Sequence, residues 1–251
     1  MGCRPGTAAA AALVIGITIV LALRGVARTD AGTGPAGPGG PLIGPRVRAW
    51  YRGLFGPIEA QLAALDVRPD HLTYAQLAVS VLAGVAFATG TIFLAGWLTI
   101  LAGTLDILDG GLARRTGRAN PRGAFVDSVT DRWAEFATFV GLGVFYRDGW
   151  MLLVVALAAF ASQMVSYVRA RAEGLGIELT GGQVQRPERY VILGFGAWLS
   201  GLTAHLLCPL LGRQTHAVLA AAVCLLAGMA VWTAIARSRD AASALAVERQ
   251  P

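Results

Sequence analysis

The chain has 251 residues, of which 55% are hydrophobic and only 14% are charged, and this balance excludes an ordinary soluble domain. Its 21 cationic side chains against 15 anionic ones leave a net charge of +6, and every cation is an arginine. Arginine grips phosphate with a planar pair of N–H donors, so we expect membrane lipids rather than nucleic acid as surroundings. Codon usage in a GC-rich genome would produce the same bias.

The N-terminal 45 residues form an appendage to the main body. An apolar run from Thr7 to Ala22 follows Arg4, which is the pattern of either a secretory signal or a membrane anchor. No convincing small-residue cleavage site follows, so residues 1–31 are interpreted as a non-cleaved anchor helix. Residues 32–45 are rich in glycine and proline and are interpreted as a flexible linker. The remaining sequence divides into a membrane domain, residues 46–240, and a C-terminal tail, residues 241–251.

The membrane domain is predicted to be all-α. Over residues 46–67, arginines alternate with Trp50, Leu54, Phe55, Ile58 and Leu62 at helical spacing, which predicts an amphipathic helix on the membrane surface. Beyond it, six apolar runs approach the roughly 20 helical residues that span a bilayer. These predicted spans cover residues 73–88, 90–108, 123–146, 149–168, 189–208 and 215–236. The fold class is therefore a polytopic membrane protein with six core transmembrane helices, a surface helix and the extra anchor.

Arginine placement predicts the orientation, because basic loops stay on the cytoplasmic side. Two loops hold most of these cations: Arg114, Arg115, Arg118 and Arg122 between the second and third spans, and Arg169, Arg171, Arg186 and Arg189 between the fourth and fifth. The opposite side has only Arg147 and Arg213. We therefore expect a protein of the cell membrane whose active site faces the cytoplasm.

Four acids lie where the second span ends and the third begins. Asp106 and Asp109 are three residues apart, and Asp127 and Asp131 are four apart, so each pair shares one face of its helix. Ionisable residues within membrane spans indicate function. A short connection makes the two helices antiparallel neighbours, and four converging carboxylates would repel unless cations lie between them. Oxygen ligands of this kind suit one or two hard divalent ions such as Mg²⁺ or Mn²⁺.

The residues between the acids favour a ligand with phosphates. Gly110 and Ala113 leave room beside the acids, Gly123 offers another close approach, and Arg114 is placed to meet a diphosphate. The alternative is a set of charged helix ends that neighbouring arginines neutralise. Four acids in this register, together with two glycines, favour the metal site.

The run Asp106-Ile-Leu-Asp109-Gly110-Gly-Leu-Ala113-Arg114, followed by Gly123, Asp127 and Asp131 at the same spacing, resembles the signature of the CDP-alcohol phosphatidyltransferases at every fixed position. The resemblance extends over about residues 46–239. It implies six transmembrane helices around a polar cavity, a homodimer, and a CDP-diacylglycerol (CDP-DAG) donor from which CMP leaves during phospholipid biosynthesis.

Position by position, the resemblance implies a role for each motif residue. Asp106, Asp109 and Asp127 would be ligands of two metal ions, and Asp131 would be both a ligand and the base that accepts the proton of the attacking hydroxyl. The segment Asp70, His71, Leu72 and Thr73 resembles the donor-binding turn of the family, and Gly110, Ala113, Arg114, Asn120 and Gly123 match further donor-binding positions.

Arg169, Arg189 and Arg237 end or begin the fourth, fifth and sixth spans. Three guanidinium groups around one cavity would bind a phosphorylated acceptor, although arginines at cytoplasmic helix ends are common in membrane proteins. The surrounding sequence is similar to actinobacterial phosphatidylinositol phosphate synthases, which implies inositol 1-phosphate as acceptor. Arg169 stands where that subfamily has lysine. Glycerol 3-phosphate, another alcohol and a noncatalytic lipid-binding role remain alternatives.

Overall fold

The computed structural model describes residues 45–177, 186–211 and 215–247. Over these ranges all regular structure is helical, which confirms the all-α class. The helices are α2 (Pro45–Ala64), α3 (Pro69–Ala88), α4 (Ile92–Arg115), α5 (Pro121–Phe145), α6 (Met151–Glu173), α7 (Arg186–Leu211) and α8 (Ala217–Val247). The predicted anchor over residues 1–31 and the linker before Pro45 lie outside the described residues.

Each predicted span coincides with one of the helices α3 to α8, and α2 stands where the surface helix is expected. Four of the described helices are long and apolar enough to cross a membrane: α3, α4, α6 and α8. In α5 the apolar sequence is interrupted by Arg122, Asp127, Asp131, Arg132 and Glu135. That α5 and α7 also cross the membrane stays a prediction.

Two helices, α4 and α8, extend furthest past the C-terminal ends of the predicted spans. α4 continues through Asp109 and Gly110 to Arg115, and α8 continues to Val247 across most of the segment that was predicted as a C-terminal tail. The α8 extension is rich in alanine, which favours helix regardless of membrane depth. α4 then ends at Thr116 and Gly117, whose positive φ of 67° suits glycine.

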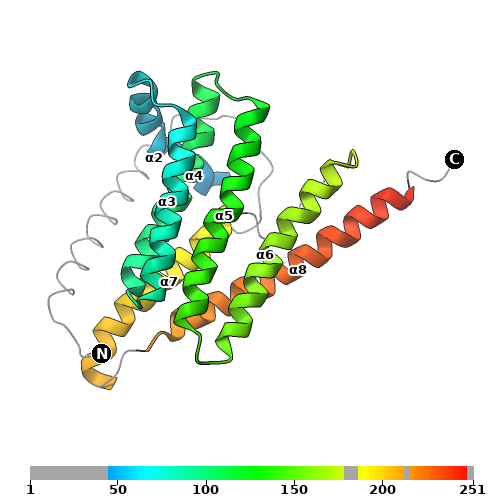
Figure 1. The fold of residues 1–251 in the computed structure, drawn as a ribbon. Coiled ribbons are helices and arrows are strands. Elements are labelled where there is room, and N and C mark those ends of the chain that lie inside the picture. Colours follow the sequence, from blue (N-terminus) through cyan, green and yellow to red (C-terminus); the bar gives the residue numbers. More distant parts are fainter. Residues whose placement is uncertain (1–44, 178–185, 212–214, 248–251) are drawn as a thin grey trace.

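Small residues bring the helices close together. α3 packs against α4 and α5, α4 also packs against α7, and α6 runs beside α8 (Figure 1). A Cβ atom added to Gly84 of α3 would meet the backbone carbonyl of Ala137 on α5, and one added to Gly96 of α4 would meet the backbone of Trp198 on α7. Such contacts let van der Waals packing hold helices together where lipid removes the hydrophobic drive between them.

The larger of two apolar clusters lies at one end of the bundle and the clustered acids lie at the other. Phe87, Ile92, Leu142, Val155 and Leu219 belong to one buried cluster, built where α3 and α5 end and where α4, α6 and α8 begin. At the opposite end α4 finishes and α5 starts, and both carry the acids there. This division leaves the acidic end free to form cavities.

Candidate metal centre and its two cavities

Three carboxylates from α4 and α5 form one cluster. Oxygen atoms of Asp106, Asp109 and Asp127 all lie within 4.8 Å of one another. Asp109 is buried, and Thr73 Oγ1 of α3 donates a hydrogen bond of 2.8 Å to its Oδ2 atom. Three anionic groups this close repel one another in the absence of a cation, and hard oxygen ligands are those that Mg²⁺, Mn²⁺ and Ca²⁺ prefer. The residues present therefore fit a divalent metal.

Asp131 lies near the cluster but is not part of the group of three. It is 1% exposed and one helical turn beyond Asp127 on α5. Its Oδ1 atom accepts a hydrogen bond of 3.3 Å from Gln76 Nε2 of α3. Asp131 nevertheless lines the same cavity as the three clustered acids, so the structure brings the predicted quartet to one place.

The first of the two cavities beside the acids has a volume of about 590 Å³ and opens beside α3, α4 and the start of α5. Most residues predicted to bind the donor line it: Asp70, Thr73, Gly110, Ala113, Arg114, Asn120 and Gly123. His71 and Leu72 are not among its lining residues. His71 is exposed in the first turn of α3, and Leu72 packs against Leu108 and Leu112, so the expected turn is part of a helix.

The first cavity is rich in phosphate-binding groups. Arg68, Arg118 and Arg122 line it together with Arg114, and sequence reasoning assigned none of the first three to a site. Asn120 caps α5, because its Oδ1 atom accepts a hydrogen bond of 2.9 Å from the Gly123 amide. The positive end of the α5 helix dipole therefore adjoins this cavity.

The two motif glycines play different parts. A Cβ atom on Gly110 would lie 3.3 Å from Arg114 Nη1, so this glycine makes room for the arginine side chain one turn later. A Cβ atom on Gly123 would meet only the Asn120 side chain, at an ordinary 3.6 Å. Packing within the protein therefore does not require a glycine at residue 123. We favour close approach of a ligand as the reason for this glycine.

The second cavity has a volume of about 660 Å³. α4 and α5 contribute the four acids, whereas α6, α7 and α8 contribute Arg169, Arg189 and Arg237. Five residues line both cavities: Asp109, Gly110, Arg114, Ala124 and Asp127. Two members of the acidic cluster therefore stand in the wall that the cavities share.

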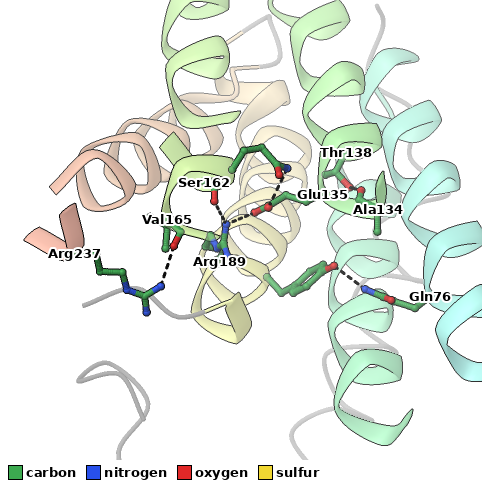
Figure 2. A network of polar contacts seen from close by, with 10 residues as sticks. Gln76, Ala134, Glu135, Thr138, Ser162, Val165, Arg189 and Arg237 are labelled. Atoms are coloured by element: carbon green, nitrogen blue, oxygen red, sulfur yellow. Dashed lines mark hydrogen bonds and ion pairs between the residues drawn. The ribbon is translucent and has the colours of Figure 1, made fainter. Parts of the chain in front are cut away.

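The three arginines of the second cavity are held differently, and Figure 2 shows two of them, Arg189 and Arg237. Arg169 is exposed and pairs with Glu173 at 2.8 Å, four residues along α6. Arg189 is 6% exposed and donates to Glu135 Oε1 at 2.6 Å and to the Ser162 carbonyl at 3.0 Å. Arg237, equally buried, donates to the Val165 carbonyl at 3.1 Å.

Sequence reasoning missed Gln76, Glu135 and Tyr190, which lie directly behind the cavity-lining residues. Gln76 and Glu135 carry a usable signal, since each is a polar side chain inside a predicted span, and such residues are rare without a role. Tyr190 follows Arg189 directly and has no comparable signal.

Comparisons with known proteins relate the chain to one enzyme family. The family model for CDP-alcohol phosphatidyltransferase matches residues 66–236. A Mycobacteroides abscessus protein named phosphatidylinositol phosphate synthase is 35% identical over 159 residues, which cover 61% of this chain and 72% of the relative. The Mycobacterium tuberculosis phosphatidylinositol phosphate synthase with CDP-DAG bound has a TM-score of 0.62 and 28% identity, over 74% of this chain and 92% of that one. The same enzyme in complex with manganese and citrate has a TM-score of 0.64 at 28% identity, over 74% and 87% of the two chains.

Proposed function

The chain belongs to the CDP-alcohol phosphatidyltransferase family, and we propose that it transfers the phosphatidyl group of CDP-DAG to inositol 1-phosphate, with release of CMP. It is an enzyme of phospholipid biosynthesis and a membrane protein. The observation that carries the proposal is the position of the acidic cluster, which adjoins two cavities that are both lined by arginines. Such a site accommodates two phosphorylated substrates with the reacting phosphorus near the acids.

We assign the donor to the first cavity. Arg68, Arg114, Arg118 and Arg122 and the start of α5 supply positive charge for a diphosphate. The solved relative with CDP-DAG bound supports a donor of this chemical class. Asp70, Thr73, Ala113, Asn120 and Gly123 are proposed to shape the cavity around the nucleotide portion.

Asp106, Asp109 and Asp127 would hold the divalent metal, and we propose two ions with Asp131 as a further ligand. Bound divalent ions would neutralise charge on the diphosphate and polarise the phosphorus–oxygen bond that breaks. The relative in complex with manganese supports a divalent ion of this kind. Without such ions the clustered carboxylates would repel a donor diphosphate.

The proposed reaction is a displacement at the phosphorus that carries the diacylglycerol. The acceptor hydroxyl oxygen forms the new bond to this phosphorus, the bond to the bridging oxygen breaks, and CMP leaves with the electron pair. Asp131 accepts the hydroxyl proton, since it lines the second cavity next to the cluster. Arg169, Arg189 and Arg237 bind the acceptor phosphate and keep its hydroxyl directed toward the acids.

The arginine-rich loops support a cytoplasmic site in the cell membrane, where nucleotide-activated lipid and sugar phosphates meet. We also propose a homodimer, on the resemblance to the family.

An acceptor panel tests the proposed function. Purified full-length protein is incubated with CDP-DAG, Mg²⁺ and, in turn, inositol 1-phosphate, glycerol 3-phosphate and free inositol, and CMP release is measured. We expect the highest kcat/KM with inositol 1-phosphate and no release in excess EDTA. Preference for glycerol 3-phosphate or free inositol would change the acceptor, and no release with any acceptor would favour a noncatalytic lipid-binding relative.

A further inference from the structure

A buried amide joins three helices behind the acids. Gln76, on α3, is 0% exposed, and its Nε2 atom donates to Asp131 Oδ1 on α5 at 3.3 Å. The same atom donates to the Tyr190 hydroxyl on α7 at 3.0 Å, and Figure 2 shows this second bond. α3 is one of the helices apolar enough to cross a membrane. A polar side chain buried at such a place costs free energy unless its hydrogen bonds are made. The Nε2 atom of Gln76 makes two donated bonds, whereas its Oε1 atom is buried with no hydrogen-bond partner among the described residues.

Tyr190 is held in place because the residue it packs against on α4, Gly103, is a glycine. A Cβ atom on Gly103 of α4 would lie 2.8 Å from Tyr190 Cβ and 2.9 Å from its Cγ. Both atoms are close to the α7 backbone, so they have little freedom to move away. Because Gly103 has no side chain, the Tyr190 ring packs directly against α4, and in this position its hydroxyl reaches Gln76.

The same face of α3 restrains two of the four acids. Thr73 donates to Asp109 and Gln76, three residues later, donates to Asp131, and this spacing places both donors on one side of the helix. A carboxylate without such a donor rotates about its terminal torsion, which is broad. A donor on one oxygen fixes the plane of the group and thereby the direction in which the other oxygen accepts a proton.

We propose that Gln76 is a positioning residue that orients the carboxylate of Asp131 for proton transfer, and that Tyr190 acts through Gln76. This inference rests on the proposed function, because it assigns Asp131 the role of base. Neither residue belongs to the family signature that the sequence displays.

The test compares near-isosteric variants of the full-length enzyme. Gln76→Met removes both donated bonds while keeping the side-chain length, and Tyr190→Phe removes only the hydroxyl. We expect Gln76→Met to lower kcat by about tenfold to a hundredfold while both KM values stay within about twofold, since orientation affects the transition state more than binding. Tyr190→Phe should lower kcat less, and the double variant should be no worse than Gln76→Met alone, because the two residues act in series.

Ser80→Ala is the matched control. Ser80 lies on the same helix one turn further on, is 0% exposed, and its Oγ atom has no hydrogen-bond partner among the described residues. This variant should keep the wild-type kcat and both KM values. CDP-DAG binding by calorimetry and the Mg²⁺ concentration that half-saturates the thermal shift are measured for every variant, and both should match wild type.

Several results would overturn the inference. These are an unchanged kcat in Gln76→Met, additive losses in the double variant, or a loss of Mg²⁺ affinity as large as the loss of kcat. If Gln76→Met does not fold, Tyr190→Phe and Gly103→Ala test the inference instead. Both variants alter the position of the Gln76 amide without changing Gln76 itself, and both should lower kcat at constant KM. Wild-type protein that releases no CMP with any acceptor contradicts the proposed function itself, which is a different outcome from a variant with normal kcat.

Discussion

At the scale of the residue, the assignments rest on four acids, of which Asp131 is the most buried. Because Asp131 lies outside the group of three, the four acids can have different roles in the reaction. Asp106, Asp109 and Asp127 lie close enough to share a cation, whereas Asp131 lies outside that group and accepts a hydrogen bond from Gln76. The same residue type thus serves as cation ligand or as base according to its neighbours.

Asp131→Asn should abolish turnover and leave donor binding nearly intact. The amide cannot take a proton from the acceptor hydroxyl, so kcat should fall by about a hundredfold to ten-thousandfold. CDP-DAG binding, measured by calorimetry with Mg²⁺ present, should change little because the cluster of three is unaltered. Normal turnover in this variant would remove Asp131 from the role of base.

Arg189→Ala and Arg169→Ala together distinguish an effect on acceptor binding from an effect on folding stability. Both should raise the acceptor KM more than the donor KM, because both arginines line the second cavity. Arg189→Ala should also lower Tm, since it leaves the largely buried Glu135 carboxylate without its ion-pair partner, at a cost of up to about 3–5 kcal/mol. Arg169 is 59% exposed in its pair with Glu173, so Arg169→Ala should leave Tm unchanged. Equal effects on both KM values would argue against the acceptor assignment.

The spacing of the acids is sufficient to predict their convergence, because three- and four-residue intervals fix a helix face whatever surrounds it. The partners of those acids are harder to predict. Gln76 lies 55 residues from Asp131 and Arg189 lies 54 from Glu135, and such pairs depend on how helices pack, which one sequence does not specify. His71 and Leu72 illustrate the limit, since they adjoin cavity residues in sequence but do not line the cavity.

At the scale of the element, apolar runs locate the helices well and their ends poorly. A run of apolar residues marks the part of a helix that lipid or core surrounds, whereas the helix ends where backbone hydrogen bonding ends. α4 therefore extends past the run to carry Asp109 and Arg114 on a helix, and α8 extends past Arg237. Both extensions reach the polar end of the bundle, where the cavities are.

The crossing of α3 and α5 depends on glycine. Because a Cβ atom at Gly84 would overlap the Ala137 carbonyl, Gly84→Leu should push apart the helices that carry Gln76 and Asp131. We expect a loss of stability of about 1–3 kcal/mol, measured as a lower Tm in detergent, together with reduced kcat. Gly228→Ala on α8 is the control, since nothing lies within 4 Å of its added Cβ, and a similar Tm loss there would contradict the packing argument.

At the scale of the whole molecule, His216, at the end of the helix bundle remote from the acids, should make the folding stability depend on pH. His216 precedes α8, its ring packs against Phe145 at the end of α5, and its Nδ1 atom lies 3.4 Å from Ser200 Oγ on α7. Burial lowers the pKa of His216 below its ordinary value of 6.5. The folded protein therefore binds this proton less readily than the unfolded chain does, and stability present above pH 6.5 is lost as the pH falls.

His216→Gln should make the Tm less sensitive to pH between about 8 and 5, because it removes the titration while keeping a polar partner for Ser200. At pH 8 the variant and the wild type should melt at similar temperatures. The measurement is thermal unfolding of purified protein in detergent over this range. An equally steep decline in the variant would show that another group controls the acid sensitivity.

The shared wall between the cavities has one further consequence for the course of the reaction. Since Asp109 and Asp127 face both chambers, donor and acceptor can be held together in a ternary complex, and no protein-bound phosphoryl intermediate is required. A single in-line displacement of this kind inverts the configuration at phosphorus. A donor made chiral at that phosphorus with oxygen isotopes or sulfur should give a product of inverted configuration. Retention of configuration would mean that the phosphatidyl group is first transferred to the protein and then to the acceptor.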